Sequence, residues 1–225
     1  MNKPIKKVLV LAAHPDDEVL GCGGILQKYK KEDGSKVYVC IITDGSSTQY
    51  QGDKTIALKK DKECDKANNL LGVDEVIRLN FPDMNLDTVP HFKLNLKIEE
   101  IVERVKPNIL FTHSSADINK DHFLINQSTM VIIRPGKSYL EKIYEYEVLS
   151  STEWQRNGTF TPNTYVDITL YIKTKMESFK QYKTEVRNYP HPRSPEGVEI
   201  LARYRGLQSG YLYAEAFKLL MSYNR

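Results

Sequence analysis

The chain has 225 residues, and its 32 basic and 29 acidic residues give a formal net charge of +3. This length fits one α/β domain, residues 1–225, with a core large enough to fold without disulfides or a structural metal. Basic residues are scattered along the chain, which argues against a nucleic-acid partner. Three cysteines are too few and too widely spaced for a disulfide framework, and no apolar run reaches the ~18 residues of a membrane helix. We therefore expect a cytoplasmic protein without stable membrane insertion.

The first half of the chain alternates short apolar runs with amphipathic segments. Strands are expected over Lys7–Ala13, Val37–Ile42, Glu75–Leu79 and Asn108–Thr112, and helices over Val19–Lys31, Ile56–Leu71 and Leu94–Val105. This order is typical of right-handed βαβ units. It predicts an α/β fold with a Rossmann-like parallel sheet and helices on both faces.

The second half is less regular. The pattern indicates helices over His122–Ile133, Lys173–Tyr182 and Glu196–Arg205, and strands over Tyr144–Ser150 and Thr164–Ile168. The proline-rich passage between the last two helices is expected to be an ordered loop.

Two clusters of potential metal ligands directly follow predicted strands. His14-Pro-Asp-Asp-Glu18 follows the first strand, and His113–His122 follows the fourth. Ligands of open α/β sheets collect at the carboxyl ends of the strands. A hydrolytic zinc site needs three protein ligands, an open position for water and a neighbouring carboxylate that takes the proton of the water. Either cluster alone could be a helix cap with loop histidines, but two clusters on nearby strands favour a metal site.

The first cluster belongs to a longer motif. Ala12-Ala-His-Pro-Asp-Asp-Glu18, continued by Val-Leu-Gly-Cys-Gly-Gly24, closely resembles the signature of the PIG-L/LmbE-like family of zinc-dependent N-acetylglucosamine deacetylases. Three further segments are similar to that family: Lys62–Gly72, Asp117–His122 and Arg205–Phe217. The resemblance implies a hydrolase that uses Zn²⁺ to remove the N-acetyl group of a small amino-sugar substrate, and it favours a homo-oligomer.

The resemblance also implies roles for individual residues. His14, Asp17 and His122 become the zinc ligands, and Asp16 becomes the general base. Asp121 would orient an imidazole, with a helix N-cap as the alternative.

Asn119 departs from the family pattern, because several members carry a histidine three residues before the last zinc ligand. An amide can donate a hydrogen bond to an oxyanion but cannot act as an acid. We therefore expect Asn119 to hold the oxyanion, with His113 or His191 supplying the missing function. For His191, a structural role in a surface loop is the alternative.

The substrate residues are predicted by location alone. Asp44, Arg78, Asp83 and His191 are candidates for the sugar pocket, although turn or surface roles are open for each, and Trp154 could stack on the sugar ring. A catalytically inactive zinc- or sugar-binding protein of the same fold is the main alternative, supported by Asn119 and opposed by the intact Asp16. A dinucleotide-dependent dehydrogenase is disfavoured, because Gly21–Gly24 follows the acidic motif instead of the strand.

Overall fold

The computed structural model describes residues 5–46 and 54–223. In these ranges seven strands form one sheet in the order β3-β2-β1-β4-β5-β7-β6. The strands are β1 Lys7–Ala12, β2 Lys36–Thr43, β3 Glu75–Phe81, β4 Ile109–His113, β5 Lys142–Tyr146, β6 Thr164–Asp167 and β7 Ala214–Ser222. The α-helices are α1 Asp17–Glu32, α2 Lys54–Leu71, α3 His91–Val105, α4 Lys120–Ile132, α5 Ile172–Phe179 and α6 Pro195–Ser209. Short 3₁₀ helices lie at η2 Leu86–Thr88 and η3 Thr152–Trp154.

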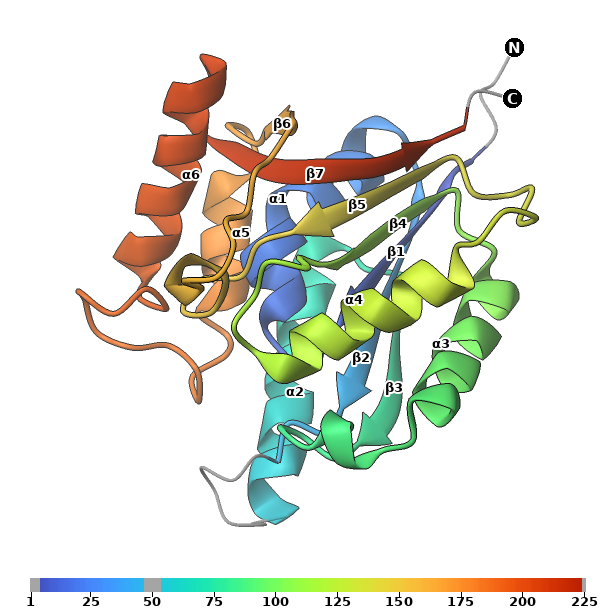
Figure 1. Ribbon diagram of the computed structural model, residues 1–225. Helices are drawn as coiled ribbons and strands as arrows, with labels where there is room; N and C mark the ends of the chain where they lie inside the picture. The colour runs from blue at the N-terminus through green and yellow to red at the C-terminus, as the bar shows by residue number, and fades with distance from the viewer. Residues whose placement is uncertain (1–4, 47–53, 224–225) are drawn as a thin grey trace.

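Strands β3, β2, β1, β4 and β5 pair in parallel, and helices cover both faces of the sheet (Figure 1). Side chains of β1 alternate between the two layers: Val8 and Val10 pack with α1, whereas Leu9 and Leu11 pack with α3 and α4. The period of two follows from the pleat of a strand that is buried on both faces. The predicted Rossmann-like α/β architecture is therefore confirmed.

The sheet is mixed, however, because β7 runs antiparallel to both β5 and β6. No clear strand pattern marks β7, since its first residues, Ala214-Glu-Ala, have low β propensity. Its pairing partners, β5 and β6, lie far away in the chain. The predicted strand Tyr144–Ser150 is also corrected to Lys142–Tyr146, and the chain then turns at Ser150, which has a φ of 65°.

Helix α1 begins at Asp17, earlier than predicted, and as predicted it includes Gly21 and Gly24. A Cβ at Gly21 would come within 2.2 Å of the Tyr146 ring, and one at Gly24 within 2.6 Å of Ile168. These glycines therefore allow the amino-terminal half of α1 to lie directly against the sheet, with Asp17 and Glu18 buried at its start.

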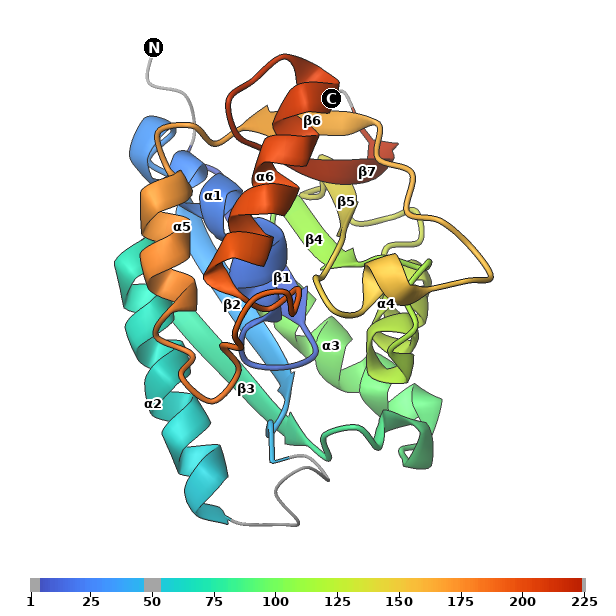
Figure 2. The same ribbon diagram turned by 90° about the vertical axis from the view of Figure 1, so that its left-hand side faces the viewer.

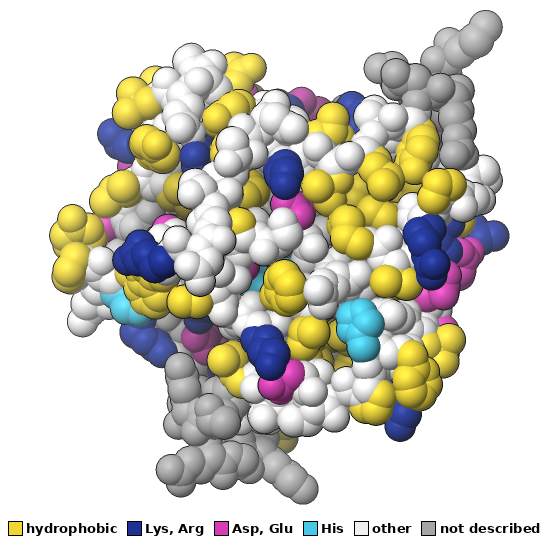
Figure 3. Space-filling view, in the orientation of Figure 1, with side chains coloured by type: hydrophobic (Ala, Val, Ile, Leu, Met, Phe, Trp, Pro, Cys, Tyr) yellow, Lys and Arg dark blue, Asp and Glu magenta, His cyan; other side chains and the backbone are white. Residues whose placement is uncertain are grey.

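On the face shown in Figure 3, lysine and arginine side chains are separated by apolar and neutral polar surface. None of the helices in the described ranges is long and apolar enough to cross a membrane.

Candidate metal and catalytic site

The two clusters of polar residues meet at the carboxyl edge of the sheet, because β1 and β4 are adjacent parallel strands. His14 and Asp17 lie on the turn from β1 into α1, and His122 lies in the first turn of α4. The turn is held by the His14 backbone N–H, which donates to Asp17 Oδ2 at 2.8 Å. Asp16 sits at its centre with a φ of 130°, a strained value for a residue with a Cβ. Such strain is typical of a functional position.

Three ligand atoms form a nearly equilateral triangle. Asp17 Oδ2 lies 3.2 Å from His14 Nδ1 and 3.3 Å from His122 Nε2, and the two nitrogens are 3.2 Å apart. Ligands of a tetrahedral metal with bonds of ~2.0–2.2 Å are separated by roughly 3.3 Å. The other carboxylate oxygen, Asp17 Oδ1, is buried without a hydrogen-bond partner. These residues therefore fit a metal ion bound by two imidazoles and one carboxylate.

The opposite nitrogen of each imidazole faces carboxylates. His14 Nε2 lies 3.0 Å from Asp83 Oδ1 and 3.4 Å from Asp121 Oδ2. His122 Nδ1 lies 3.1 Å from Asp117 Oδ2. Such contacts keep the proton on the outer nitrogen and direct the other lone pair to the metal. Asp121 therefore lies where it can orient the His14 imidazole, and Asp117 lies where it can orient the His122 imidazole.

The role of Asp117 was missed from the sequence, because two carboxylates, Asp117 and Asp121, lie between His113 and His122 and spacing does not distinguish them. Asp117 also accepts hydrogen bonds from the Ser151 and Thr152 hydroxyls, so the segment after β5 holds it in place. The N-cap of α4 is Asn119, whose Oδ1 accepts from the Asp121 backbone N–H at 2.9 Å. The alternative interpretation of Asp121 as the cap was wrong.

The electrostatics of the metal-free site follow from these contacts. Burial alone would lower the pKa of His14 and His122, but the neighbouring carboxylates outweigh it and raise the pKa of His122 to about 9. Burial would raise the pKa of Asp17, yet the histidines hold it well below its ordinary value. Against the same effect of burial, His122 and two hydroxyls lower the pKa of Asp117 to about 2. Without a metal, protons on the imidazoles balance the buried carboxylates.

Asp16 lies beside the triangle and is 1% exposed. Its Oδ2 is 3.3 Å from Arg193 Nη1. Burial raises the pKa of Asp16 well above its ordinary value, and the Arg193 guanidinium opposes that shift. A carboxylate with an elevated pKa next to a metal can accept and return a proton.

Glu18, the last acid of the motif, stabilises the turn. Its Oε2 accepts from the Asp16 backbone N–H at 3.1 Å, and its Oε1 accepts from Asn68 Nδ2 at 2.8 Å and from the Tyr182 hydroxyl. Neither Glu18 nor Arg193 received a role from the sequence. For Glu18, the only indication in the sequence is its place as the third acid of the motif. For Arg193, a single arginine in a loop carries no indication of a role.

A pocket of about 280 Å³ opens beside the triangle, and of the three residues of the triangle His14 lines it. Figure 2 shows the segment between α5 and α6 beside the turn that joins β1 to α1, and this segment forms one wall. Of the residues predicted for substrate or catalysis, Asp16, Asp83, Asn119, Trp154 and His191 line the pocket. Its complete lining is His14, Pro15, Asp16, Lys60, Asp83, Met84, Asn119, Ser150, Trp154, Glu185, Arg187, His191 and Arg193.

Three predicted residues do not line this pocket. Asp44 Oδ1 accepts from the backbone and hydroxyl of Ser46 within its own turn. Arg78 is directed toward α2, where its Nε is 2.8 Å from Asp61 Oδ1 and its Nη2 is 2.6 Å from Asp65 Oδ1.

His113, the third, is fully buried behind the ligands. Its Nε2 accepts from the Ala13 backbone N–H at 2.8 Å, and its ring stacks on His122 with centroids 3.9 Å apart. Burial and the His122 charge hold its pKa well below the ordinary value. A neutral imidazole in this place packs against a ligand and does not reach the pocket.

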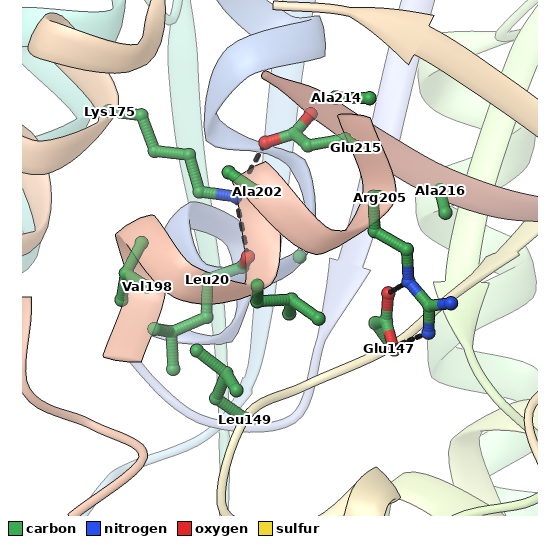
Figure 4. Close-up of a pocket in the computed structure, with 12 residues that line it drawn as sticks. Leu20, Glu147, Leu149, Lys175, Val198, Ala202, Arg205, Ala214, Glu215 and Ala216 are labelled. Atoms are coloured by element: carbon green, nitrogen blue, oxygen red, sulfur yellow. Dashed lines mark hydrogen bonds and ion pairs between the residues drawn. The ribbon is translucent and has the colours of Figure 1, made fainter. Parts of the chain in front are cut away.

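A second hollow lies between α1, α5, α6 and β7 (Figure 4). Lys175 Nζ donates to the Leu20 carbonyl at 2.8 Å and to Glu215 Oε1 at 2.6 Å, and Arg205 forms a two-pronged ion pair with Glu147. The volume of about 10 Å³ holds one water at most. This hollow is part of the packing of the carboxyl-terminal segments.

Known proteins match both the sequence and the fold. The family model for GlcNAc-PI de-N-acetylase (PIG-L) matches residues 9–133, which include the whole triangle. The uncharacterized deacetylase YaiS of Escherichia coli is 29% identical over 188 residues, covering 80% of this chain and 91% of the relative. Diacetylchitobiose deacetylase of Thermococcus kodakarensis is 24% identical over 234 residues, covering 98% and 86%.

The solved structure of the conserved protein TT1542 from Thermus thermophilus has a TM-score of 0.78 at 26% identity, covering 98% of this chain and 97% of that one. The matched family range contains both ligand clusters, and the similarity to deacetylases extends through the carboxyl-terminal strands. The chain therefore belongs to the GlcNAc-PI de-N-acetylase (PIG-L) family, as the resemblance of its first motif predicted.

Proposed function

We propose that this protein is a zinc-dependent hydrolase that removes the N-acetyl group from an N-acetylglucosamine-type sugar or sugar conjugate. The observation that carries the proposal is the Asp16 carboxylate, buried beside the His14–Asp17–His122 triangle at the floor of a pocket. The deacetylase relatives support the same reaction.

Zinc is the metal that we propose for the triangle, because two imidazoles and one carboxylate are a common donor set of hydrolytic zinc. When bound, zinc supplies a Lewis acid that activates water and favours negative charge on a carbonyl oxygen. The same donors also suit Fe(II), so metal analysis is part of the test.

Side chains of the pocket carry out proton transfer and stabilise the oxyanion. Asp16 takes the proton of the attacking water, and the Arg193 guanidinium holds its outer oxygen in place. Asn119 uses its Oδ1 for the cap of α4, which leaves its Nδ2, 3.7 Å from Met84 Sδ, as a donor on the pocket wall. A donor there can stabilise the oxyanion that forms as the amide is attacked.

His191 is the second candidate for a polar role during the reaction. Burial and the charges of Arg187 and Arg193 lower its pKa below 6.5, so the imidazole is mainly neutral at neutral pH and can donate one hydrogen bond. Its ring lies 6.1 Å from that of Trp154, edge to face. Trp154, 43% exposed, offers an apolar surface for the sugar ring.

The alternative is a catalytically inactive protein that binds zinc or sugar. It is supported by Asn119, which replaces the histidine of several family members, and opposed by the placement of Asp16. A buried carboxylate with an elevated pKa beside the triangle suits proton transfer, which a protein that only binds zinc or sugar does not require. A cytoplasmic location and a homo-oligomeric state stay predictions from the sequence.

The test is acetate release from N-acetylglucosamine and diacetylchitobiose by metal-stripped protein reloaded with zinc or iron. We expect one equivalent of zinc per chain and activity that returns with zinc. Stoichiometric zinc without acetate from any N-acetylated sugar would favour the binding protein.

A further inference from the structure

The charged groups of the pocket are paired with one exception. Lys60 Nζ is 2.8 Å from Glu185 Oε1, and Arg193 Nη1 is 3.0 Å from Glu185 Oε2 as well as 3.3 Å from Asp16 Oδ2. Asp83, on the metal side, faces His14. These contacts use the carboxylates of the pocket lining. Against the opposing effect of burial, the charges of Lys60 and Arg187 help to lower the pKa of Glu185, but Arg187 forms no ion pair among the residues that the structure describes.

The half-buried Arg187 is nevertheless held in a fixed position. Its Nη1 donates to the Thr184 carbonyl at 2.7 Å and to the Val186 carbonyl at 3.2 Å. Its backbone N–H donates to the Arg193 carbonyl at 3.0 Å, which joins the two arginines in one loop. The other edge of the guanidinium, formed by Nε and Nη2, makes no hydrogen bond within residues 5–46 and 54–223. Two parallel N–H groups on this edge match the oxygens of a carboxylate or phosphate.

Arg187 also acts within the pocket, because its charge contributes to the lowered pKa of His191. It lines the same pocket as Trp154 and Asp16. A substrate with its acetyl group at the triangle and its sugar ring near Trp154 would therefore place a further substituent of the sugar in the part of the pocket that Arg187 lines.

We propose that Arg187 forms an anion subsite, and that the substrate is an N-acetylglucosamine conjugate with a carboxylate or phosphate group. This inference rests on the proposed function. The free Nε–Nη2 edge binds the anion in two parallel hydrogen bonds, and the backbone carbonyls at Nη1 fix the orientation of the guanidinium. Neutral N-acetylated sugars bind without this contact and are poorer substrates.

The experiment compares kcat/KM for acetate release from two anionic and two neutral sugars. N-acetylmuramic acid carries a carboxylate, N-acetylglucosamine 6-phosphate carries a phosphate, and N-acetylglucosamine and its methyl glycoside are neutral. Wild type should prefer at least one anionic sugar by about tenfold or more, and the two anionic arms distinguish carboxylate from phosphate. Arg187→Gln should lower kcat/KM for that sugar by roughly 10–100-fold, mainly through KM, because the variant loses two parallel hydrogen bonds between charged groups.

Two variants separate the subsite from general effects. Arg187→Lys keeps the charge without the fork and should recover only part of the preference. Lys183→Gln removes an exposed cation four residues away that does not line the pocket, so the preference should persist. An anion preference unchanged in Arg187→Gln and Arg187→Lys, or a wild type that prefers neutral sugars, would overturn the proposal.

Calorimetry separates this proposal from the deacetylase assignment if no sugar releases acetate. Tighter binding of an anionic sugar to zinc-loaded wild type than to Arg187→Gln would support the subsite while the deacetylase assignment fails. Equal binding to the two proteins, or no binding to either, would overturn the subsite as well.

Discussion

Asp117 Oδ2 lies 3.1 Å from His122 Nδ1, on the side of the imidazole opposite the metal triangle. The carboxylate is itself held by the Ser151 and Thr152 hydroxyls, so a segment that follows β5 fixes a ligand that begins α4. The orientation of the proposed ligand His122 therefore depends on a residue outside the triangle.

Asp117→Asn is expected to weaken zinc binding by roughly 10–100-fold, because an amide orients the imidazole and raises its basicity less than a carboxylate does. Competition with a chromophoric chelator measures the affinity. Asp44→Asn, at the same edge of the sheet but confined to its own turn, is the matched control and should bind zinc like wild type. Equal affinities for Asp117→Asn and wild type would show that the contact is incidental.

Zinc affinity should rise with pH up to about pH 9. The carboxylates around His122 raise its pKa in the metal-free fold from 6.5 to about 9. A raised folded-state pKa means that the protonated imidazole stabilises the metal-free protein below about pH 6.5, and that this contribution is lost as the pH rises through 9. Zinc must displace that proton and the one on His14, whose pKa the carboxylates also raise, so affinity should increase by more than about tenfold and at most about a hundredfold per pH unit between 6.5 and 9.

Zinc affinities at four pH values, corrected for protonation of the chelator, test this dependence. The rise should flatten at a lower pH in Asp117→Asn, which loses one of the carboxylates that raise the pKa of His122. An affinity independent of pH between 7 and 9 would contradict the assignment of a protonated His122.

Asn119 has two functions that a single substitution can separate. Its Oδ1 caps α4, and its Nδ2 is the proposed donor to the oxyanion. Asn119→Asp keeps a good cap and should change the free energy of unfolding by only a few tenths of a kcal/mol, while acetate release falls by roughly 100-fold or more. Asn119→Ala should lose the cap as well, at about 1 kcal/mol. Urea denaturation and turnover measure the two functions, and full activity in Asn119→Asp would remove Asn119 from the chemistry.

Gly21→Ala should destabilise the fold by about 1–3 kcal/mol, because the added methyl group would overlap the Tyr146 ring. Gly158→Ala is the control, since a Cβ there meets its nearest neighbour at an ordinary 3.7 Å. Urea denaturation compares the two variants. Equal stabilities would mean that α1 does not need the close approach that places Asp17.

The sequence predicts the parallel half of the sheet from local patterns, because apolar runs mark β1 and β4 and a polar cluster follows each of them. The family resemblance, and not the pattern alone, selects His14, Asp17 and His122 from these clusters as the proposed metal ligands. The carboxyl ends of adjacent parallel strands then bring these residues together.

Other features depend on contacts between distant segments, which no local pattern records. Strand β7 pairs with β5 and β6 across the chain, and its amino-terminal residues do not favour a strand. Arg78 lies in β3, close in sequence to the carboxyl end of the strand where the pocket was expected. Its side chain instead forms ion pairs with carboxylates on α2. Arg187 and Arg193 reach the pocket only through the loop after α5.

The most direct test of the central claim is acetate release by zinc-loaded Asp16→Asn beside wild type and Asp44→Asn, with zinc content measured in all three proteins. The account predicts full zinc in each, wild-type turnover in Asp44→Asn, and a loss of roughly 10²–10⁴-fold in Asp16→Asn, because Asp16 is the proposed acceptor of the proton of the attacking water. An Asp16→Asn protein that binds zinc and deacetylates at the wild-type rate would contradict it.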